Sequence, residues 1–462
     1  MNLATKFDPL YWQCACLCVN AGNYAGELGI EEDDGETDED SADGAEEKKE
    51  RKVAPNYAKI AKAISDAQCA GVRIELPDIN EAEADFVPDV KNNAIIYSLK
   101  AVSAVSDDLF DRIVAGRPYS SIDDFLTRVQ PTQGQMIGLI KAGCFDSIAG
   151  EPRARIMARY LQRLADEQFP LKDKLTSVQL KKALELGLRL DGFAEEIRMF
   201  HFKQYIDKEQ FDKETKRYIL SDPDCLRFFD SYVKPRLSVS KDEFGPLPEG
   251  KSFMKKSAFD KVYAASIDKL MAHINSEDGR KAYQRLLQDD FIAQMKEKYC
   301  DGGVARWEFD TMSFYHDRHE LAGMSDTRYG VRDFATLPEY PEEGDKRLCA
   351  VAGTVIGNNN IRHTVSLLTR YGVVDVKFYK DAYAKFNQII SVVDPATKKK
   401  TVIDPSWLKR GSRILVYGQR RENMFAAKNL FVDRAPRCVG LIEGVSQDGS
   451  LSIRFARRKK AD

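Results

Sequence analysis

No stretch of the 462-residue sequence contains the roughly 18 consecutive apolar residues that a membrane-spanning helix requires. The first residues, MNLATKFDPLYWQCACLCV, contain one lysine, no uninterrupted apolar core and no clear cleavage site. These features are untypical of a secretory signal peptide. The sequence therefore predicts a protein that makes no use of the membrane and resides in the cytoplasm.

Cysteine pairs with the spacing of a structural zinc site are also missing. The nine cysteines are scattered apart from Cys14, Cys16 and Cys18, whose spacing of two does not fit a C-x-x-C ligand pair. We expect free thiols in a reducing cytoplasm.

Histidine is scarce, with five residues in the whole chain, so metal ligands are few. His316, Asp317 and His319 lie within one helical turn and are the best candidates for a metal site. We expect His319 to be a packed histidine instead, and we predict no metal site.

Motifs that would mark common enzyme classes are absent as well. The sequence has no G-x-x-x-x-G-K-[ST] phosphate loop, no G-x-G-x-x-G and no G-x-S-x-G. Two-metal phosphoryl transfer needs carboxylates on adjacent strands that hold the ions about 4 Å apart. Outside an acidic run near the N-terminus, the one D-x-D is Asp222-Pro223-Asp224, and proline is unsuited to a central strand. We therefore predict no catalytic residues in this chain.

Negative charge is concentrated in one segment. Residues 31–50 contain twelve acidic residues and two lysines, a local charge of −10, whereas the whole chain carries −2. The remainder is therefore positive by about +8. Because the segment has almost no apolar side chains to offset its ordering entropy, we expect it to be disordered.

Hydrophobic periodicity changes along the chain. Apolar residues recur at helical spacing in the first two thirds and alternate as in strands from Arg347 onward. In 55–70, for example, Ile60, Ile64 and Ala67 share one helical face. The other predicted elements are a helix at 3–19 buried on most of its circumference, helices at 107–116, 121–130, 133–142 and 152–166, a short strand or extended link at 94–99 and a mostly helical stretch at 175–300.

The alternating C-terminal part predicts a small β-barrel. In GVVDVKFY, Val374, Val376 and Phe378 lie on one face, and in IRHTVSLLTR Val365 and Leu367 do the same. About five short strands with one helix between the third and the fourth is the order of an OB-fold barrel. The further expected strands are 348–355, 413–417, 424–432 and 451–455.

The outward-facing positions of these strands carry basic and aromatic side chains. They are Arg362, Arg370, Tyr371, Lys377 and Tyr379. Such interleaving suits single-stranded nucleic acid, because bases stack on rings and cations follow phosphates. Polar residues also simply face water on a half-buried sheet, so the pattern leaves both interpretations open.

Residues 71–150 hold the most informative pattern, a helical unit that opens GVRIELPDIN and ends in the joint LIKAGCFDSIAGEPRARIM. It contains two helix–turn–helix joints, each followed by basic residues. Together with KFDPLYWQCACLCVN, RWEFDTMSFYHDRHEL and CAVAGTVIGNNNIRHTVSLLTRYGVVDVKFYKDAY, this order of parts resembles the bacterial and phage C-family replicative DNA polymerases, the DNA polymerase III alpha subunits. The resemblance covers most of 3–150 and 305–432.

The resemblance implies a tandem helix–hairpin–helix region, but the two joints differ. In the family the first hairpin is glycine-rich, since glycine lets backbone amides approach a phosphate in a tight turn. Here those positions are Ser103, Ala104, Val105 and Ser106, which indicates a degenerate, structural joint, although the serine hydroxyls can still donate. The second joint keeps its glycine, and phosphate binding is expected there. Its predicted contacts are Lys141, Gly143, Arg153, Arg155 and Arg159, with a solvated basic helix face as the alternative.

Sequence and resemblance together predict a multidomain α plus β protein, mostly helical in its N-terminal and middle part, with a tandem helix–hairpin–helix and a C-terminal OB-fold β-barrel. The expected divisions are 1–30, the end of a fingers helix; 31–52, a disordered acidic loop; 53–168, a helix–hairpin–helix DNA-binding domain; 169–304, a helical insertion; 305–345, a linker; 346–435, the OB-fold domain; and 436–462, a C-terminal hairpin and basic tail.

The implied function is that of the C-terminal part of a split replicative polymerase. Because the family's palm and nucleotide-binding fingers correspond to residues before this match, the chain is expected to grip template and primer DNA for a partner chain. That partner would carry the palm carboxylates and Mg²⁺, and this chain itself would need no cofactor. A large phage is the source that such a split gene would suit.

Two other functions remain open at this stage. One is an independent replication accessory protein that binds single-stranded DNA or a DNA junction, and the other is an enzyme centred in the helical stretch 175–300. The expected partners are duplex and single-stranded DNA and the polymerase chain, with a sliding clamp as a candidate through Gln168-Phe169-Pro170-Leu171. The acidic run is either a solvated loop or a tethered anion that competes with DNA for a basic surface.

Overall fold

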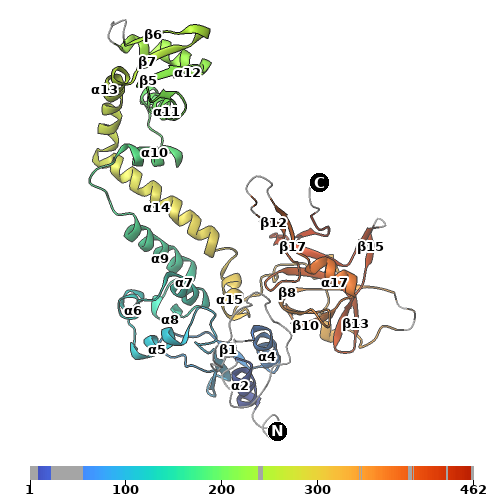
Figure 1. The fold of residues 1–462 in the computed structure, drawn as a ribbon. Helices are drawn as coiled ribbons and strands as arrows, with labels where there is room; N and C mark the ends of the chain where they lie inside the picture. Colours follow the sequence, from blue (N-terminus) through green and yellow to red (C-terminus); the bar gives the residue numbers. More distant parts are fainter. Residues whose placement is uncertain are drawn as a thin grey trace, which may run out of the picture. The chain divides into compact units, whose positions relative to one another are not determined.

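The computed structural model describes residues 9–21, 56–237, 243–342, 344, 346–393, 398, 400–432 and 435–458. The chain divides into two compact units, and Figure 1 shows their elements. Unit 1 comprises Met1–Met157 and Cys300–Asp462, and unit 2 comprises Ala158–Tyr299. None of the described helices is long and apolar enough to cross a membrane. The predicted acidic loop, 31–52, lies outside the described residues.

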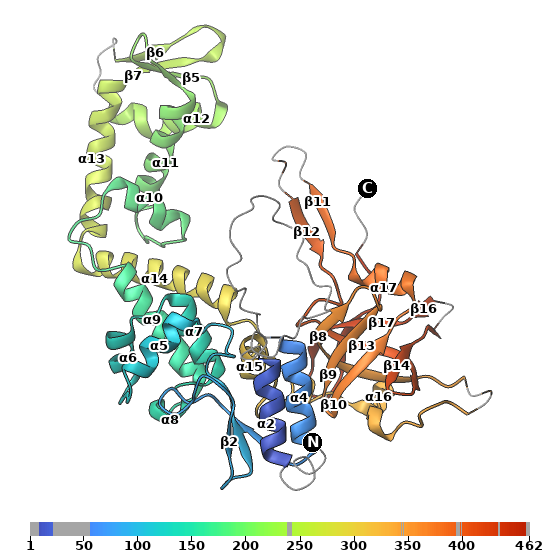
Figure 2. The same cartoon turned by 60° about the horizontal axis from the view of Figure 1, so that its bottom comes forward.

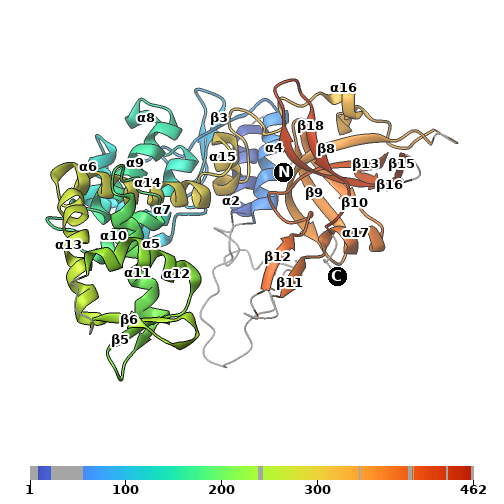
Figure 3. The same ribbon diagram turned by 90° about the horizontal axis from the view of Figure 1, so that it is seen from above.

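Two helices at the N-terminal end of unit 1 lie side by side, α2 (Pro9–Asn20) and α4 (Tyr57–Cys69). The predicted apolar face of α4 is buried in full. The helix also lies against strands of the barrel described below (Figures 2 and 3), which it contacts through Ala61 and Ser65. Helix α2 was expected to be buried on most of its circumference, and this prediction is wrong. Its buried residues form a single stripe because only one side contacts α4 and its neighbours: Leu10, Cys14 and Leu17.

The helix–hairpin–helix region contains the predicted helices, with ends that differ from the expectation by at most two residues. Three of them begin at a side chain that accepts a hydrogen bond from the first turn: Ser106, Ser121 and Thr132. The helices are α5 (Asp107–Ala115), α6 (Ile122–Val129), α7 (Gln133–Ala142), α8 (Asp146–Ala149) and α9 (Arg153–Gln168). A small sheet of order β1-β3-β2 precedes them, formed by β1 (Arg73–Glu75), β2 (Val87–Asp89) and β3 (Ala94–Ile96).

The C-terminal part of unit 1 is a closed five-stranded barrel with the strand order of an OB fold. Strands β8, β9 and β10 form an antiparallel meander, and β14 closes the barrel by pairing parallel with β10 and antiparallel with β13, which pairs back to β8. Helix α17 lies between the third and fourth barrel strands in the chain, as predicted. The elements are β8 (Cys349–Asn359), β9 (Thr364–Thr369), β10 (Gly372–Lys377), α17 (Lys380–Asn387), β13 (Arg413–Arg421) and β14 (Met424–Ala427).

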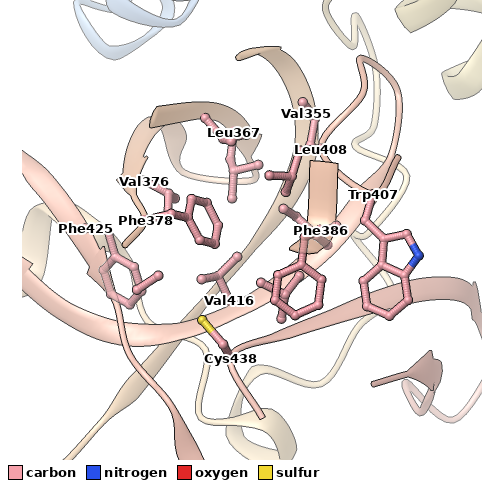
Figure 4. Close-up of a cluster of buried hydrophobic side chains, with 14 of the residues drawn as sticks. Val355, Leu367, Val376, Phe378, Phe386, Trp407, Leu408, Val416, Phe425 and Cys438 are labelled. Atoms are coloured by element: carbon pink, nitrogen blue, oxygen red, sulfur yellow. The ribbon is translucent and has the colours of Figure 1, made fainter. Parts of the chain in front are cut away.

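The barrel interior is filled by the residues whose alternation predicted the strands. Val365, Leu367, Val374 and Val376 are all buried, and Figure 4 shows Leu367 and Val376 pointing into the same cluster as Phe425. The cluster continues toward α17, where Phe386 stacks on Trp407 at 5.4 Å between ring centroids. The predicted inward and outward faces of β9 and β10 are therefore confirmed.

Further elements surround the barrel. Strand β17 pairs with β13 on one side and with β18 on the other. Two separate hairpins are formed by β11 with β12 and by β15 with β16. Their bounds are β11 (Ile390–Val393), β12 (Lys400–Asp404), β15 (Leu430–Val432), β16 (Ala435–Arg437), β17 (Val439–Val445) and β18 (Leu451–Arg454). The lead-in to the barrel contains α15 (Val304–Met312), α16 (Asp326–Tyr329) and η4 (Phe334–Thr336).

The stretch 175–300 was predicted to be mostly helical, and this prediction is confirmed, but the stretch also contains a small sheet that was not predicted. Besides helices it contains an antiparallel four-stranded sheet of order β4-β5-β7-β6, whose core includes Tyr218, Phe229 and Phe259. The strands are two to four residues long, too short to show an alternating pattern among helical segments. The elements are α10 (Ser177–Glu185), α11 (Ala194–Glu209), β4 (Phe211–Asp212), β5 (Arg217–Leu220), α12 (Pro223–Phe228), η1 (Phe229–Val233), η2 (Lys234–Arg236), β6 (Phe244–Pro246), η3 (Pro248–Gly250), β7 (Ser252–Lys255), α13 (Lys256–Ile274) and α14 (Glu277–Tyr299).

Candidate nucleic-acid interface

The second helix–hairpin–helix joint is built around Arg153. Its guanidinium donates to Asp146 Oδ2 at 2.8 Å and to Glu308 Oε1 at 2.7 Å, and the side chain is only 6% exposed. The other oxygen of Glu308 accepts the backbone N–H of His316 at 2.9 Å. The prediction that Arg153 contacts a phosphate is wrong, because its guanidinium is buried and bound to two carboxylates and is not accessible to a ligand. Arg153 instead fixes the joint to α15.

Gly143 and Lys141 serve the same joint. Gly143 ends α7 with φ of +80°, and a Cβ at this position would lie 2.7 Å from the Arg153 guanidinium. Glycine is therefore required both by the left-handed backbone and by the space that Arg153 occupies. The Lys141 side chain is largely buried, with its Nζ 3.8 Å from Asp310 Oδ2. Both residues are therefore buried parts of the joint and are not accessible to a phosphate.

The surface beside this joint is acidic. A hollow of about 310 Å³ is lined by Gly143, Ser147 and His316 together with carboxylates. Burial raises the pKa of Asp146, and the ion pair with Arg153 offsets only part of this effect. A phosphate would be repelled from this hollow. Its acidic lining residues are Glu75, Asp78, Glu81, Asp89 and Asp146.

The exposed cations of the second joint lie further along α9. Arg155 and Arg159 are exposed and stand four residues apart, so they share one face of the helix. Of the five predicted contacts at this joint, these two have the exposure that a phosphate contact requires.

The first joint is held by packing and by a helix cap. Ser106 is the N-cap of α5, where its hydroxyl accepts from Leu109 N at 3.3 Å, and Ser103 N donates to Thr311 O at 3.0 Å. Ala104 lies directly against Gly138 of α7, where there is no room for another methyl group. These contacts support the predicted structural role of this joint.

The outer face of the barrel is partly covered from within unit 1. Helix α4 packs on β8, β9 and β10, with Val373 N donating to Ser65 Oγ at 3.2 Å. Beside this contact, Leu368 and Ile356 join Ala61 and Phe309 in a small apolar cluster. Sequence alternation indicated an outer face open to solvent or nucleic acid, but could not reveal that a helix about 300 residues earlier in the chain covers part of that face.

Two of the five predicted barrel residues are engaged with α16. The Arg370 guanidinium pairs with Asp326 and donates to Ala322 O at 3.2 Å, and the Tyr371 hydroxyl donates to Asp326 Oδ2 at 2.5 Å. This arrangement fixes the lead-in segment to the barrel.

The other three predicted barrel residues are exposed. Arg362 and Lys377 lie next to each other, since the Lys377 ammonium donates to the carbonyl of Arg362. Tyr379 stands two residues after the end of β10, with 71% of its surface exposed. Two cations and one exposed aromatic ring thus lie at the ends of two paired β-strands. This combination suits single-stranded nucleic acid, whose phosphates bind cations and whose bases stack on rings.

The basic C-terminal segment carries a site that the sequence did not reveal. The fully buried carboxylate of Asp404 accepts from Arg454 Nη2 at 3.1 Å, from Arg457 Nε at 2.8 Å and from Trp407 Nε1 at 3.1 Å. Burial opposes ionisation of Asp404, but these hydrogen bonds outweigh it and hold its pKa below the usual value. The sequence marked this segment only as a basic tail. Up to Arg458 it is instead anchored at the base of β12.

The remaining candidate residues have structural partners. Asp222 caps α12 by accepting from Asp224 N and Cys225 N at 3.0 and 2.9 Å, so this D-x-D belongs to a helix start. Among the described residues, Glu308, His316 and Asp317 offer metal-ligand atoms within 4.8 Å of one another, but both Glu308 oxygens already accept hydrogen bonds.

Both ring nitrogens of His319 are also used. Its Nδ1 accepts from Leu321 N at 3.0 Å, and its Nε2 lies 2.9 Å from Leu368 O. Burial lowers the pKa of His319 to about 4. The expectation of a packed histidine at this position fits these contacts.

The candidate clamp-binding peptide lies in unit 2. Phe169 packs edge-on against Phe291 at 5.7 Å between centroids, and its carbonyl accepts from Gln284 Nε2 at 3.0 Å. Leu171 is exposed. The peptide is therefore docked on α14 through its aromatic residue.

Comparison with known proteins identifies the relatives of this architecture. The helix–hairpin–helix motif family matches residues 71–156. The chain is 32% identical over 476 residues to the probable DNA polymerase YorL of Bacillus subtilis and, to the same extent, to the DNA-directed DNA polymerase of Bacillus phage SPbeta. In both cases 99% of this chain and 34% of the relative are covered, so the chain spans about a third of the length of these curated relatives. The DNA polymerase III alpha subunit of Chlamydia muridarum is 28% identical over 256 residues, 52% of this chain and 20% of the relative.

Proposed function

Because the chain belongs to the C-family DNA polymerases, whose members include the DNA polymerase III alpha subunits, we propose that it grips template and primer DNA during replication. The observation that carries the proposal is the combination of a helix–hairpin–helix region and a closed OB barrel in one compact unit. Both modules suit nucleic acid, the first through duplex phosphates and the second through a single strand.

The proposal assigns separate surfaces to the two DNA forms. Duplex phosphates bind along the exposed face of α9 at Arg155 and Arg159, and a single strand runs past Arg362, Lys377 and Tyr379. The acidic hollow at the second joint repels the backbone and directs it toward α9.

Catalytic groups are supplied from outside these residues in this proposal. The chain corresponds to about a third of each relative, so the counterparts of the other two thirds belong either to a partner polypeptide or to a longer form of this chain. We propose the partner polypeptide, which carries the palm carboxylates and binds Mg²⁺.

Fluorescence anisotropy with labelled duplex, primer–template and single-stranded DNA tests the binding function. We expect affinity for primer–template to exceed that for either simple form, and to fall steeply with salt because phosphates are neutralised. Replacing Arg155 and Arg159 by Gln is expected to weaken duplex binding and to reduce the slope of log K against log salt by about two. Failure of the wild-type chain to bind any of the three DNAs would refute the proposal.

Co-expression tests the partner arrangement. A candidate chain bearing the polymerase palm is expected to co-purify with this chain and to extend a primer more processively in its presence. Primer extension by this chain alone with Mg²⁺, or no complex and no gain, would contradict the partner arrangement while leaving DNA binding intact.

A further inference from the structure

Strands β11 and β12 form a ribbon of their own. They pair antiparallel with each other, from Val393 opposite Lys400 to Ile390 opposite Asp404, and with no other strand among the described residues. In the chain the ribbon lies between α17 and β13, and Figure 2 shows it extending away from the barrel. An isolated two-stranded ribbon does not bury a face of its own.

One face of this ribbon combines aliphatic side chains with a cation. Side chains directly opposite each other share a face, so Val393 with Lys400 and Ser391 with Val402 lie together. Val393 is 55% exposed and Val402 is 52% exposed. Exposed valines on an unpaired ribbon are normally avoided, because such edges promote association. This face is therefore suited to a ligand that covers it.

The charge of the ribbon indicates what that ligand is. In the sequence from 389 to 403 three lysines stand against one acidic residue, and the described Lys398 and Lys400 are both exposed. Interfaces between proteins are depleted of lysine at their centre. Lysines beside small aliphatic groups instead match a DNA groove, where cations contact phosphates and apolar side chains contact bases.

The base of the ribbon is held firmly. Asp404 at the end of β12 is the buried carboxylate that accepts from Arg454, Arg457 and Trp407. Arg457 also donates to Phe386 O at 2.8 Å, which ties the end of α17 to the same point. The ribbon therefore starts from a fixed direction, and less ordering entropy is lost when it meets a ligand.

We propose that the β11–β12 ribbon is a DNA-binding arm that enters a groove of duplex DNA. Lys398 and Lys400 contact the phosphates, and Val393 and Val402 lie against base edges. A two-stranded ribbon has the width that the major groove of B-DNA admits. This inference rests on the proposed DNA-binding function but names a surface separate from α9 and from the strand ends at Lys377.

The test compares two hairpin variants of the full chain with a matched control. Lys398→Gln/Lys400→Gln is expected to reduce the slope of log K against log salt for duplex DNA by about two. Val393→Ser/Val402→Ser is expected to weaken duplex binding about tenfold without changing that slope. The control, Lys181→Gln/Lys208→Gln on exposed lysines of unit 2, is expected to bind as the wild type does.

A photo-crosslinking amino acid at position 393 supplies the second measurement and is expected to capture duplex DNA. If the wild-type chain binds duplex but both hairpin variants bind equally well and position 393 captures no DNA, the ribbon inference is wrong and the proposed function stands. Capture of a protein at position 393 in place of DNA would likewise overturn it. If the wild-type chain binds no DNA at all, both the ribbon inference and the proposed function are wrong.

Discussion

The guanidinium of Arg153 lies 2.7 Å from the carboxylate of Glu308, a residue 155 positions further along the chain, and both side chains are buried. This pair fastens the second helix–hairpin–helix joint to α15. Helix α15 is in turn bound to the barrel, since Arg306 donates to Gly411 O at 2.6 Å and Arg410 donates to Phe309 O at 3.3 Å. One short helix thus connects both candidate DNA-binding modules.

Arg153→Met is expected to lower the free energy of unfolding by about 3–5 kcal/mol, because it leaves the buried Glu308 charge without a partner. Arg153→Met/Glu308→Gln should recover a large part of this loss, since the amide still accepts from His316 N and carries no charge. Urea unfolding measures both. Arg155→Met, on the exposed face of the same helix, serves as the control and should change stability by less than about 0.5 kcal/mol. Equal losses for the single and the double variant would contradict the ion-pair explanation.

Two glycines of α7 should respond in opposite ways to alanine. Gly134→Ala is expected to stabilise the protein by up to about 1 kcal/mol, because the position is exposed, helical and surrounded by open space. Gly138→Ala is expected to destabilise by about 1–3 kcal/mol, because the new methyl group meets Ala104 of the first joint. Thermal unfolding distinguishes them, and Ala104→Gly/Gly138→Ala should restore stability if the close contact is the cause.

His319 should make stability depend on pH. Its pKa in the folded protein is about 4, below the ordinary value of 6.5, because the neutral ring is buried. The contribution of the neutral His319 ring to the free energy of unfolding is fully present above pH 6.5. It is lost as the pH falls toward 4, because over this interval the unfolded chain binds the proton and the folded protein does not. Over this interval the loss should reach about 3 kcal/mol. Unfolding of wild type and His319→Gln between pH 4.5 and 7 should differ in slope, whereas His201→Gln, at an exposed position, should follow the wild type.

The two exposed tyrosines at the barrel should differ in their effect on single-stranded DNA. Tyr379→Ala is expected to weaken binding about tenfold, because stacking of one base on a ring contributes about 1–3 kcal/mol. Tyr371→Ala should weaken it far less, since that hydroxyl is held by Asp326 and the residue fastens α16 to the barrel. Anisotropy with labelled oligonucleotides provides the comparison. If the two variants weaken binding equally, Tyr379 does not stack on a base.

Local patterns predicted the elements and the barrel well, because their causes are local. Ser106 and Thr132 are helix caps that stand next to the helices they begin, and the alternation of Val374 and Val376 follows from the period of a strand. The order of strands and helix was enough to identify the OB fold. The sheet of unit 2 was missed because its strands are shorter than the window in which a period can be seen.

The site was predicted less well, because the decisive partners are distant in sequence. Arg153 and Arg155 look alike in the sequence, and only the position of Glu308 separates a buried tie from an exposed cation. In the same way Asp326 engages Arg370, and α4 covers part of the sheet that carries Lys377. Exposure, which decides whether a basic residue can bind a phosphate, is set by tertiary contacts.

The position of α15 between the helix–hairpin–helix region and the barrel has a consequence for association kinetics. Since the hydrogen bonds of Arg306 and of Arg153 fix both modules to the same helix, the distance between them is set by the protein and not by a flexible linker. Under the proposed function, a DNA molecule captured by one module is presented to the other at a high effective concentration. We therefore expect this chain to release DNA slowly, because dissociation requires both contacts to break before either forms again.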